Sequence, residues 1–294
     1  MRPGTTFTPR SRHSATPPNG AKVTTIHHPS ERDTRILKIL DPNDGHRFLP
    51  SHWLHAHFPN AHPNRFVRRL GHLREDQNAF LKWADFPLNI PLVNTRHGVY
   101  ELAPKGAKAL GVVAPRFRPQ ELAHEFLNCL VDCSIKFGAR ANGVEYLTND
   151  PLSIKLDAGQ LIPDGRPFVL ASGGRTVFFP GKEIDRATEA LTSNKLKTTA
   201  IARKIDLYAG FMHQRLYRGY GFPNALIPIV TISEGRMRAM MRLVEAMIGP
   251  CAWLLFKHTK DWAHEAHFPK PNGDMLTEPW LRVGHPPFSM LTLS

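Results

Sequence analysis

The chain has 294 residues, 41% of them hydrophobic, so it is long enough for about two domains with ordinary cores. Its 38 Lys and Arg residues outnumber its 25 Asp and Glu residues and give a net charge of +13, which points to a polyanionic partner and above all to nucleic acid. Three cysteines, no secretory signal and no apolar run near the ~20 residues that span a bilayer argue against a disulfide scaffold or a membrane protein and favour a cytoplasmic one.

The first third of the chain divides into a tail and a small domain. Residues 1–29 combine Pro, Thr, Ser and Arg without hydrophobic periodicity, which predicts a disordered basic tail. Residues 30–111 alternate apolar helical patterns with strong turn signals, and a short final helix stops at Gly111. Before it, three helices and then two extended segments are expected, at 30–40, 49–58, 64–74, about 79–84 and 97–103.

Three helices followed by a two-stranded wing are the layout of a winged helix. The stretch from Tyr100 to Leu110 resembles the end of many winged-helix DNA-binding domains. By this resemblance the third helix enters the major groove of double-stranded DNA and the wing touches the backbone. The residues expected to contact DNA are Arg65, Arg68, Arg69 and Arg74 on the helix, with Arg96 and Lys105 near the wing. The residues expected to face inward on the third helix are Phe66, Val67, Leu70 and Leu73. The alternative is a solvated basic face on a winged helix that binds protein.

The sequence of residues 119–294 predicts an α+β domain with a C-terminal extension. Pro119 opens a helix that Gly138 is expected to close, because proline favours the first turn and glycine the end of a helix. A mixed sheet covered by helices follows from the order of the later segments. Those segments are a strand at 144–148, a hairpin, a helix over 186–216 bent near 192–199, a strand at 226–233, a helix at 234–248 and a strand at 251–257.

Two acidic triplets flank the hairpin. Pro163-Asp164-Gly165 lies at its entrance, Gly173-Gly174 supplies its turn, and Glu183-Ile184-Asp185 is expected on its second strand. Carboxylates on adjacent strands form a seat for a divalent cation, and Mg²⁺ favours such oxygen ligands. The spacing is typical of the PD-(D/E)xK, or restriction-endonuclease-like, fold, provided that Asp164 and Glu183 converge on one pocket.

Residues 30–280 resemble the replication-relaxation family, bacterial proteins of plasmids and other mobile elements with a winged helix ahead of an endonuclease-like domain. The most specific piece is the string from Glu183 to Glu189. The other matching pieces are Leu122–Glu125, Pro163–Asp164, Phe178–Phe179, Lys204–Tyr208, Pro228–Thr231 and Arg236–Arg238. The resemblance implies a DNA-binding role in replication or mobilisation, with further proteins of those processes as partners.

In an active enzyme of this fold, Asp and Glu hold Mg²⁺ and a Lys two residues after the Glu assists. This chain has Asp185 at that position, so Lys204 is expected to reach in from the next helix. Lys182 precedes Glu183 by one residue and is expected to point to the opposite sheet face. The expected metal ligands are Asp164, Glu183 and Asp185, and the expected catalytic residues are these three with Lys204 and Glu125 or Glu121.

A second function stays open within the same fold. The carboxylates can be structural, with Asp185 paired to Arg186 or to helix N–H groups. The chain is then a non-catalytic transcription regulator, which dimerises through its C-terminal domain, or an assembly adaptor. The histidines at 52, 55, 57 and 62 are expected to be solvated or to face DNA, since no cysteine pair accompanies them. Cys129 and Cys133 are expected to pack in the core.

Overall fold

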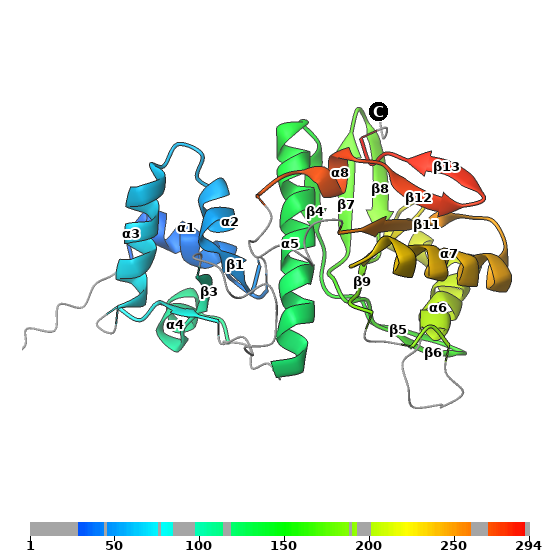
Figure 1. Ribbon diagram of the computed structural model, residues 1–294, viewed down its shortest axis with the longest axis horizontal. Coiled ribbons are helices and arrows are strands. Elements are labelled where there is room, and N and C mark those ends of the chain that lie inside the picture. The colour runs from blue at the N-terminus through cyan, green and yellow to red at the C-terminus, as the bar shows by residue number, and fades with distance from the viewer. Residues whose placement is uncertain are drawn as a thin grey trace, which may run out of the picture.

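The structure is a computed structural model of a mixed α+β protein, which confirms the fold class at that level (Figure 1). It describes residues 29–43, 46–75, 78–84, 98–113, 119–187, 190–192, 201–259 and 270–291. The expected tail, except for residue 29, lies outside the described residues, and so do Arg96 and most of the expected bend at 192–199. Among the described helices, none is both long and apolar enough to cross a bilayer.

The described N-terminal elements form four helices and a small antiparallel sheet. The first helix is fixed by a capping box, in which Ser30 Oγ accepts from Asp33 N–H and the Asp33 carboxylate accepts from Ser30 N–H. The helix expected from Leu49 begins only at Ser51, because Leu49 and Pro50 pair with Tyr100 and Val99 in the sheet. The elements are α1 (Glu31–Ile39), β1 (Leu49–Pro50), α2 (Ser51–Ala56), α3 (Pro63–Arg74), β2 (Leu81–Trp83), β3 (Val99–Leu102) and α4 (Pro104–Leu110), with sheet order β1-β3-β2.

The buried face of α3 is narrower than the sequence pattern predicts. Phe66, Leu70 and Leu73 are buried, but Val67 is 48% exposed. Phe66, Leu70 and Leu73 are spaced by three or four residues and share one face of α3, whereas Val67 is turned about 100° from Phe66 and falls outside that face. Val67 therefore belongs to the solvent face of α3 and not to the core.

The long helix α5 (Pro119–Ala141) lies between the N-terminal elements and the larger sheets (Figure 1). It packs against the N-terminal side, where the rings of Trp53 and Phe137 stack with centroids 5.9 Å apart. Gly138 was expected to end this helix, yet the helix continues to Ala141. Gly138 instead permits the close approach of Gly273, whose carbonyl oxygen would lie 2.7 Å from a Cβ at position 138.

The second half contains two main sheets. An antiparallel sheet has the order β4-β7-β8, and a mixed sheet has the order β13-β12-β11-β10-β9 with β9, β10 and β11 parallel. A single bridge between Phe178 and Ala225 connects them. The strands are β4 (Glu145–Thr148), β5 (Ile154–Leu156), β6 (Gly159–Leu161), β7 (Phe168–Ser172), β8 (Arg175–Phe179), β9 (Glu183–Asp185), β10 (Ile227–Thr231), β11 (Cys251–His258), β12 (Trp280–Val283) and β13 (His285–Phe288). The helices are α6 (Ile201–His213), η2 (Leu216–Tyr220), α7 (Glu234–Ile248) and α8 (Asp274–Thr277).

Two expectations about this half are wrong. Glu183 does not lie on the second strand of the hairpin, because β8 ends at Phe179 and Glu183 begins the separate strand β9, which pairs with β10. The helix expected over 186–216 is shorter: the described residues between Arg186 and Thr192 are not helical, and α6 ends at His213.

Side-chain alternation along the strands divides the core between the two faces of the sheets. Phe168, Leu170 and Ile184 pack in the cluster that contains α5 and the N-terminal elements. Val169 and Ile229 pack in a second cluster with α6 and α7. Neighbouring residues of β9 therefore face different helices, which decides where the acidic residues of this strand point.

Candidate active site

Asp164 lies just before β7 and is tied to β9 by the backbone. Its Oδ2 accepts a hydrogen bond from the N–H of Ile184 at 2.9 Å, and the N–H of Gly165 donates to the carbonyl of Lys182 at 3.2 Å. The Pro-Asp-Gly triplet is thus held beside the strand that begins at Glu183, as the sequence spacing predicts.

Asp164 receives two cationic side chains from opposite helices. His124 Nε2 of α5 lies 3.2 Å from Oδ2, and Lys204 Nζ of α6 lies 3.6 Å from the same atom. Asn128, one turn after His124, donates to the Asp164 carbonyl at 3.0 Å. Burial acts to raise the pKa of Asp164, but the His124 hydrogen bond and the Lys204 charge outweigh it and hold this pKa well below its ordinary value. Asp164 is therefore ionised at neutral pH.

Glu183 is buried on the α6 side of the sheet. The Tyr208 hydroxyl donates to Oε1 at 2.5 Å, and Lys204 Nζ lies 2.9 Å from Oε2. Burial and the charge of Asp164 raise the pKa of Glu183 to about 8, although Lys204 and Tyr208 act in the opposite direction. Glu183 therefore carries a proton near neutral pH when no further cation is present.

Lys204 joins the two carboxylates, since its ammonium lies within 3.6 Å of an oxygen of each. The expectation that Lys204 reaches Asp164 and Glu183 from α6 agrees with this geometry, whereas its catalytic role stays a prediction. Lys182 points the other way, toward α5, where its Nζ lies 3.5 Å from Asp132. The structure thus brings an Asp, a Glu and a Lys together from three separate elements.

Asp185 has a different environment from Glu183, although both lie on β9. Its carboxylate accepts two hydrogen bonds from Arg236, at 2.9 and 3.0 Å, and one from Thr231 Oγ1 at 2.8 Å. The expected pairing with Arg186 is wrong, and the partner is Arg236 in the first turn of α7. Both oxygens of Asp185 are occupied by protein donors, so this residue braces β9 against β10 and α7.

Glu125 follows His124, the residue of α5 whose side chain contacts Asp164. Its carboxylate forms an ion pair with Arg47, with Nη1 and Oε2 3.6 Å apart. Both Glu125 and Asp164 line a polar cavity of about 90 Å³ that also includes Arg166 and Lys182. Glu125 is therefore a neighbour of the Asp164 site through this cavity, while His124 makes the direct contact.

Two contacts in this site were not singled out from the sequence. His124 precedes Glu125 in the Leu-Ala-His-Glu string, and burial, which lowers the pKa of His124, is outweighed by the Asp164 hydrogen bond, so this pKa is raised. Tyr208 lies four residues after Lys204 on α6, and residues at this spacing share one helix face. The spacing could have predicted the Tyr208 contact, because a side chain four residues after Lys204 lies on the same face of α6 and reaches Glu183 as well.

Helix α3 carries the arginines expected to contact DNA, and they differ in their surroundings. Arg65 and Arg68 are exposed. Arg69 forms a two-point ion pair with Asp33, which is fully buried and also caps α1. Arg69 therefore has a structural partner, and the exposed pair Arg65 and Arg68 carries the expectation of DNA contact.

The basic residues nearer the wing pack on aromatic rings. The guanidinium of Arg74 lies 3.7 Å from the ring centre of Trp83, which is itself 55% exposed. Lys105 is exposed, with its ammonium 4.7 Å from the ring centre of Phe80. These contacts fix the direction of both side chains while leaving the Arg74–Trp83 pair at the surface.

The chain was also compared with known proteins. Searches against protein-family models, curated proteins and solved structures found no match to this chain. The resemblance to the replication-relaxation family stays a prediction based on the residues quoted for it.

Proposed function

We propose that the protein binds double-stranded DNA and nicks it in a Mg²⁺-dependent reaction, in the replication or mobilisation of a plasmid or another mobile element. The observation that carries the enzymatic part is the convergence of Asp164, Glu183 and Lys204, with one ammonium within 3.6 Å of both carboxylates. This is the set of groups that metal-dependent hydrolysis of a phosphodiester requires.

The donor set fits Mg²⁺, which prefers carboxylate oxygens. Oε2 of Glu183 is buried, and its partner among the described residues is the Lys204 ammonium 2.9 Å away, so a cation would take the place of that ammonium. When bound, Mg²⁺ would supply an activated water and neutralise charge on the phosphate. A cation held beside Glu183 would lower the pKa of this residue and favour its carboxylate form.

The remaining groups then have roles set by their contacts. Tyr208 orients Glu183 through its hydrogen bond, and His124 with the Ile184 N–H orients Asp164. With Mg²⁺ bound between the carboxylates, Lys204 would donate to a phosphate oxygen or orient the attacking water. His124, at 31% side-chain exposure, lies where the site meets solvent.

The arrangement of the sheets supports the endonuclease-like assignment. The order is α5, β4, the β7–β8 hairpin, β9, α6 and β10, with β9 and β10 parallel and joined through α6. Asp164 precedes β7 of one sheet and Glu183 begins β9 of the other, and the hydrogen bond from the Ile184 N–H to Asp164 joins the two segments. Asp185 departs from the family pattern, and Lys204 provides the missing cation from the helix.

The N-terminal elements support DNA binding. Three helices with a sheet in the order β1-β3-β2 agree with a winged helix, in which α3 is the helix that enters the major groove. Arg65 and Arg68 are exposed on α3. The net charge of +13 favours attraction to the DNA backbone.

A second function, that of a DNA-binding platform without cleavage, is favoured by the state of the acids. Glu183 is protonated near neutral pH and already satisfied by Tyr208 and Lys204, and Asp185 is neutralised by Arg236. In this function the same contacts hold β9 in place and no metal enters.

A plasmid-nicking assay separates the two functions. The protein is incubated with supercoiled plasmid and Mg²⁺, and nicked circles are quantified with and without chelator. The nuclease proposal predicts chelator-sensitive nicking that falls by at least about 100-fold in Asp164→Asn and in Lys204→Met, because each change removes a charge from the reacting centre.

The matched controls are exposed charges close in the fold. Asp206→Asn changes an exposed carboxylate on α6, and Lys155→Met changes an exposed lysine on β5. Both controls keep parental nicking. DNA binding without Mg²⁺-dependent nicking by the parent protein selects the platform, and nicking that survives Asp164→Asn removes the proposed centre.

A further inference from the structure

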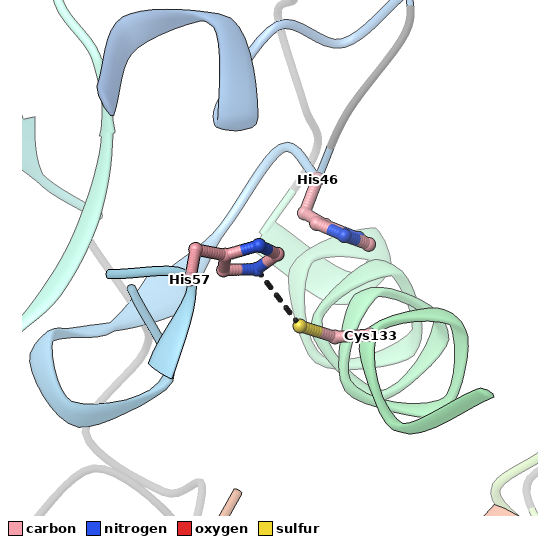
Figure 2. Close-up of side chains that lie close together, drawn as sticks. All are labelled: His46, His57 and Cys133. Carbon is pink, nitrogen blue, oxygen red and sulfur yellow. Dashed lines mark hydrogen bonds between the residues drawn. The ribbon is translucent and has the colours of Figure 1, made fainter. Parts of the chain in front are cut away.

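A second cluster of metal-ligand side chains lies between the N-terminal elements and α5. His46 precedes β1, His57 follows α2 and Cys133 lies on α5, and their side chains point toward one another (Figure 2). One potential ligand atom from each lies within 4.8 Å of the others, and His57 Nε2 lies 3.3 Å from Cys133 Sγ. The three residues are 87 positions apart at most in sequence (46 to 133), so only the folded chain assembles them.

We propose that His46, His57 and Cys133 bind one zinc ion that fastens the N-terminal elements to α5. In tetrahedral zinc sites, bonds of about 2.0–2.1 Å to nitrogen and about 2.3 Å to sulfur place neighbouring ligand atoms about 3.5 Å apart. The 3.3 Å separation of the His57 and Cys133 atoms is close to this value, and the upper limit of 4.8 Å for the set leaves only a small side-chain movement.

His46 has a carboxylate beside its ring that can orient it for a metal. It is 2% exposed, and among the described residues its Nδ1 makes no hydrogen bond, although Asp132 Oδ2 lies 3.3 Å away. A small rotation of the ring directs Nδ1–H to Asp132 and leaves Nε2 for the metal, which is the usual carboxylate–histidine–zinc arrangement.

The charged groups around the cluster either oppose or compensate the charge of a bound zinc ion. Lys136 and Arg140 lie near enough to act on His57 and oppose a cation. On binding, the Cys133 thiol releases its proton to solvent and becomes a thiolate, and this charge with that of Asp132 compensates the ion. The fourth position falls to a water, since His46 and Asp132 also line the 90 Å³ cavity, which has room for one.

Other uses of the cluster agree less well with its surroundings. A nucleophilic cysteine must meet its substrate, and Cys133 is 0% exposed. A simple thiol–imidazole hydrogen bond accounts for the contact between His57 and Cys133 but gives no role to His46, which lies beside them. The zinc site uses all three residues and explains why histidines of the N-terminal part turn inward at this interface.

The test measures zinc in untagged protein after incubation with zinc sulfate and dialysis against metal-free buffer. Parent protein is expected to retain one zinc per chain, with sulfur and imidazole nitrogen in the X-ray absorption spectrum. Cys133→Ser and His57→Gln are each expected to lose at least about 10-fold in zinc affinity, as removal of a ligand or its close support does. Cys129→Ser is the matched control, because Cys129 is also buried on α5 but lies outside the cluster.

Circular dichroism of each variant distinguishes lost ligands from lost folding, and Co²⁺ added to the parent provides a readout that needs no variant. A thiolate-to-cobalt charge-transfer band in the parent, retained in Cys129→Ser, supports the site. Parent protein without retained zinc and without this band, or a folded Cys133→Ser that binds zinc as the parent does, overturns the proposal. The outcome is independent of DNA nicking, since neither His57 nor Cys133 contacts Asp164 or Glu183.

Discussion

The ion pair between Asp185 and Arg236 offers the sharpest test of how the acidic triplet is used. Replacing Arg236 by Ala leaves the Asp185 carboxylate, whose side chain is 2% exposed, with only Thr231 as a donor. Removing one partner of a buried ion pair typically costs about 3–5 kcal/mol, because the remaining charge is buried without compensation. We expect Arg236→Ala to lose this amount of unfolding free energy.

Arg238, two residues further along α7, is the matched control. It pairs with Glu234 at 3.4 Å, but these side chains are 51% and 60% exposed. Exposed pairs contribute about 0–1 kcal/mol, so Arg238→Ala is expected to change stability by less than about 1 kcal/mol. Both substitutions change Arg to Ala on α7, and they differ in that the Arg236 pair is buried and the Arg238 pair is exposed.

The assay is urea unfolding followed by circular dichroism at neutral pH, with unfolding free energies obtained by linear extrapolation. Adding Asp185→Asn to Arg236→Ala is expected to recover part of the loss, because the buried charge is removed. If Arg236→Ala and Arg238→Ala lose the same amount, or if Asp185→Asn deepens the loss, the interpretation of Asp185 as a structural brace is wrong.

Two further predictions concern pH and DNA. Because burial raises the pKa of Glu183 from 4.5 to about 8, the folded state holds a proton that the unfolded state releases, so the contribution of Glu183 to stability is fully present below about pH 4.5 and is lost as the pH rises toward 8. Between about pH 5 and 8 this contribution falls by about 1 kcal/mol per pH unit, so the difference in stability between the parent and Glu183→Gln is expected to change by that amount per unit. A difference that does not change with pH would show that the acid is ionised throughout. Arg65→Ala with Arg68→Ala is expected to weaken duplex binding and to lower the log–log salt slope by about 2, since each phosphate contact contributes about 0.9. Arg175→Ala, an exposed change on the tip of the β7–β8 hairpin, is the control, and an unchanged slope in the double variant removes α3 from the DNA interface.

Local sequence patterns predicted the elements that depend on neighbouring residues. Ser30 and Asp33 define the start of α1, Gly173-Gly174 gives the hairpin turn, and 234–248 forms α7 as expected. Asp164 and Lys204 both reach Glu183, as expected, although the reason differs: β7 and β9 belong to different sheets, and the hydrogen bond from the Ile184 N–H to Asp164 brings the two acids together.

The errors arise where a distant partner decides the outcome. Asp185 pairs with Arg236, 51 positions later, in preference to its neighbour Arg186. Gly138 lies inside α5 because Gly273 packs on it, a contact across 135 positions (138 to 273). No local pattern contains these partners, and tertiary contacts override the helix-ending tendency of glycine.

His57 illustrates the same limit at the proposed zinc site. From sequence it was expected to be solvated or to face DNA, but burial against α5 lowers its pKa to about 3 and places it beside Cys133. The histidines at 52, 55 and 62 lie in the same stretch, so only the docking of α5 on α2 selects the one at 57. That docking depends on Trp53 and Phe137, which stack across the interface.

The most direct test of the central claim is a crystal structure of the protein grown with Mn²⁺ in place of Mg²⁺, with data collected for manganese anomalous scattering. The account predicts an anomalous peak bonded to oxygens of Asp164 and Glu183, with Lys204 displaced from Oε2, and no peak in crystals of Asp164→Asn. The account is contradicted if crystals grown in the same Mn²⁺ buffer show no anomalous peak between the two carboxylates and Lys204 still bridges them.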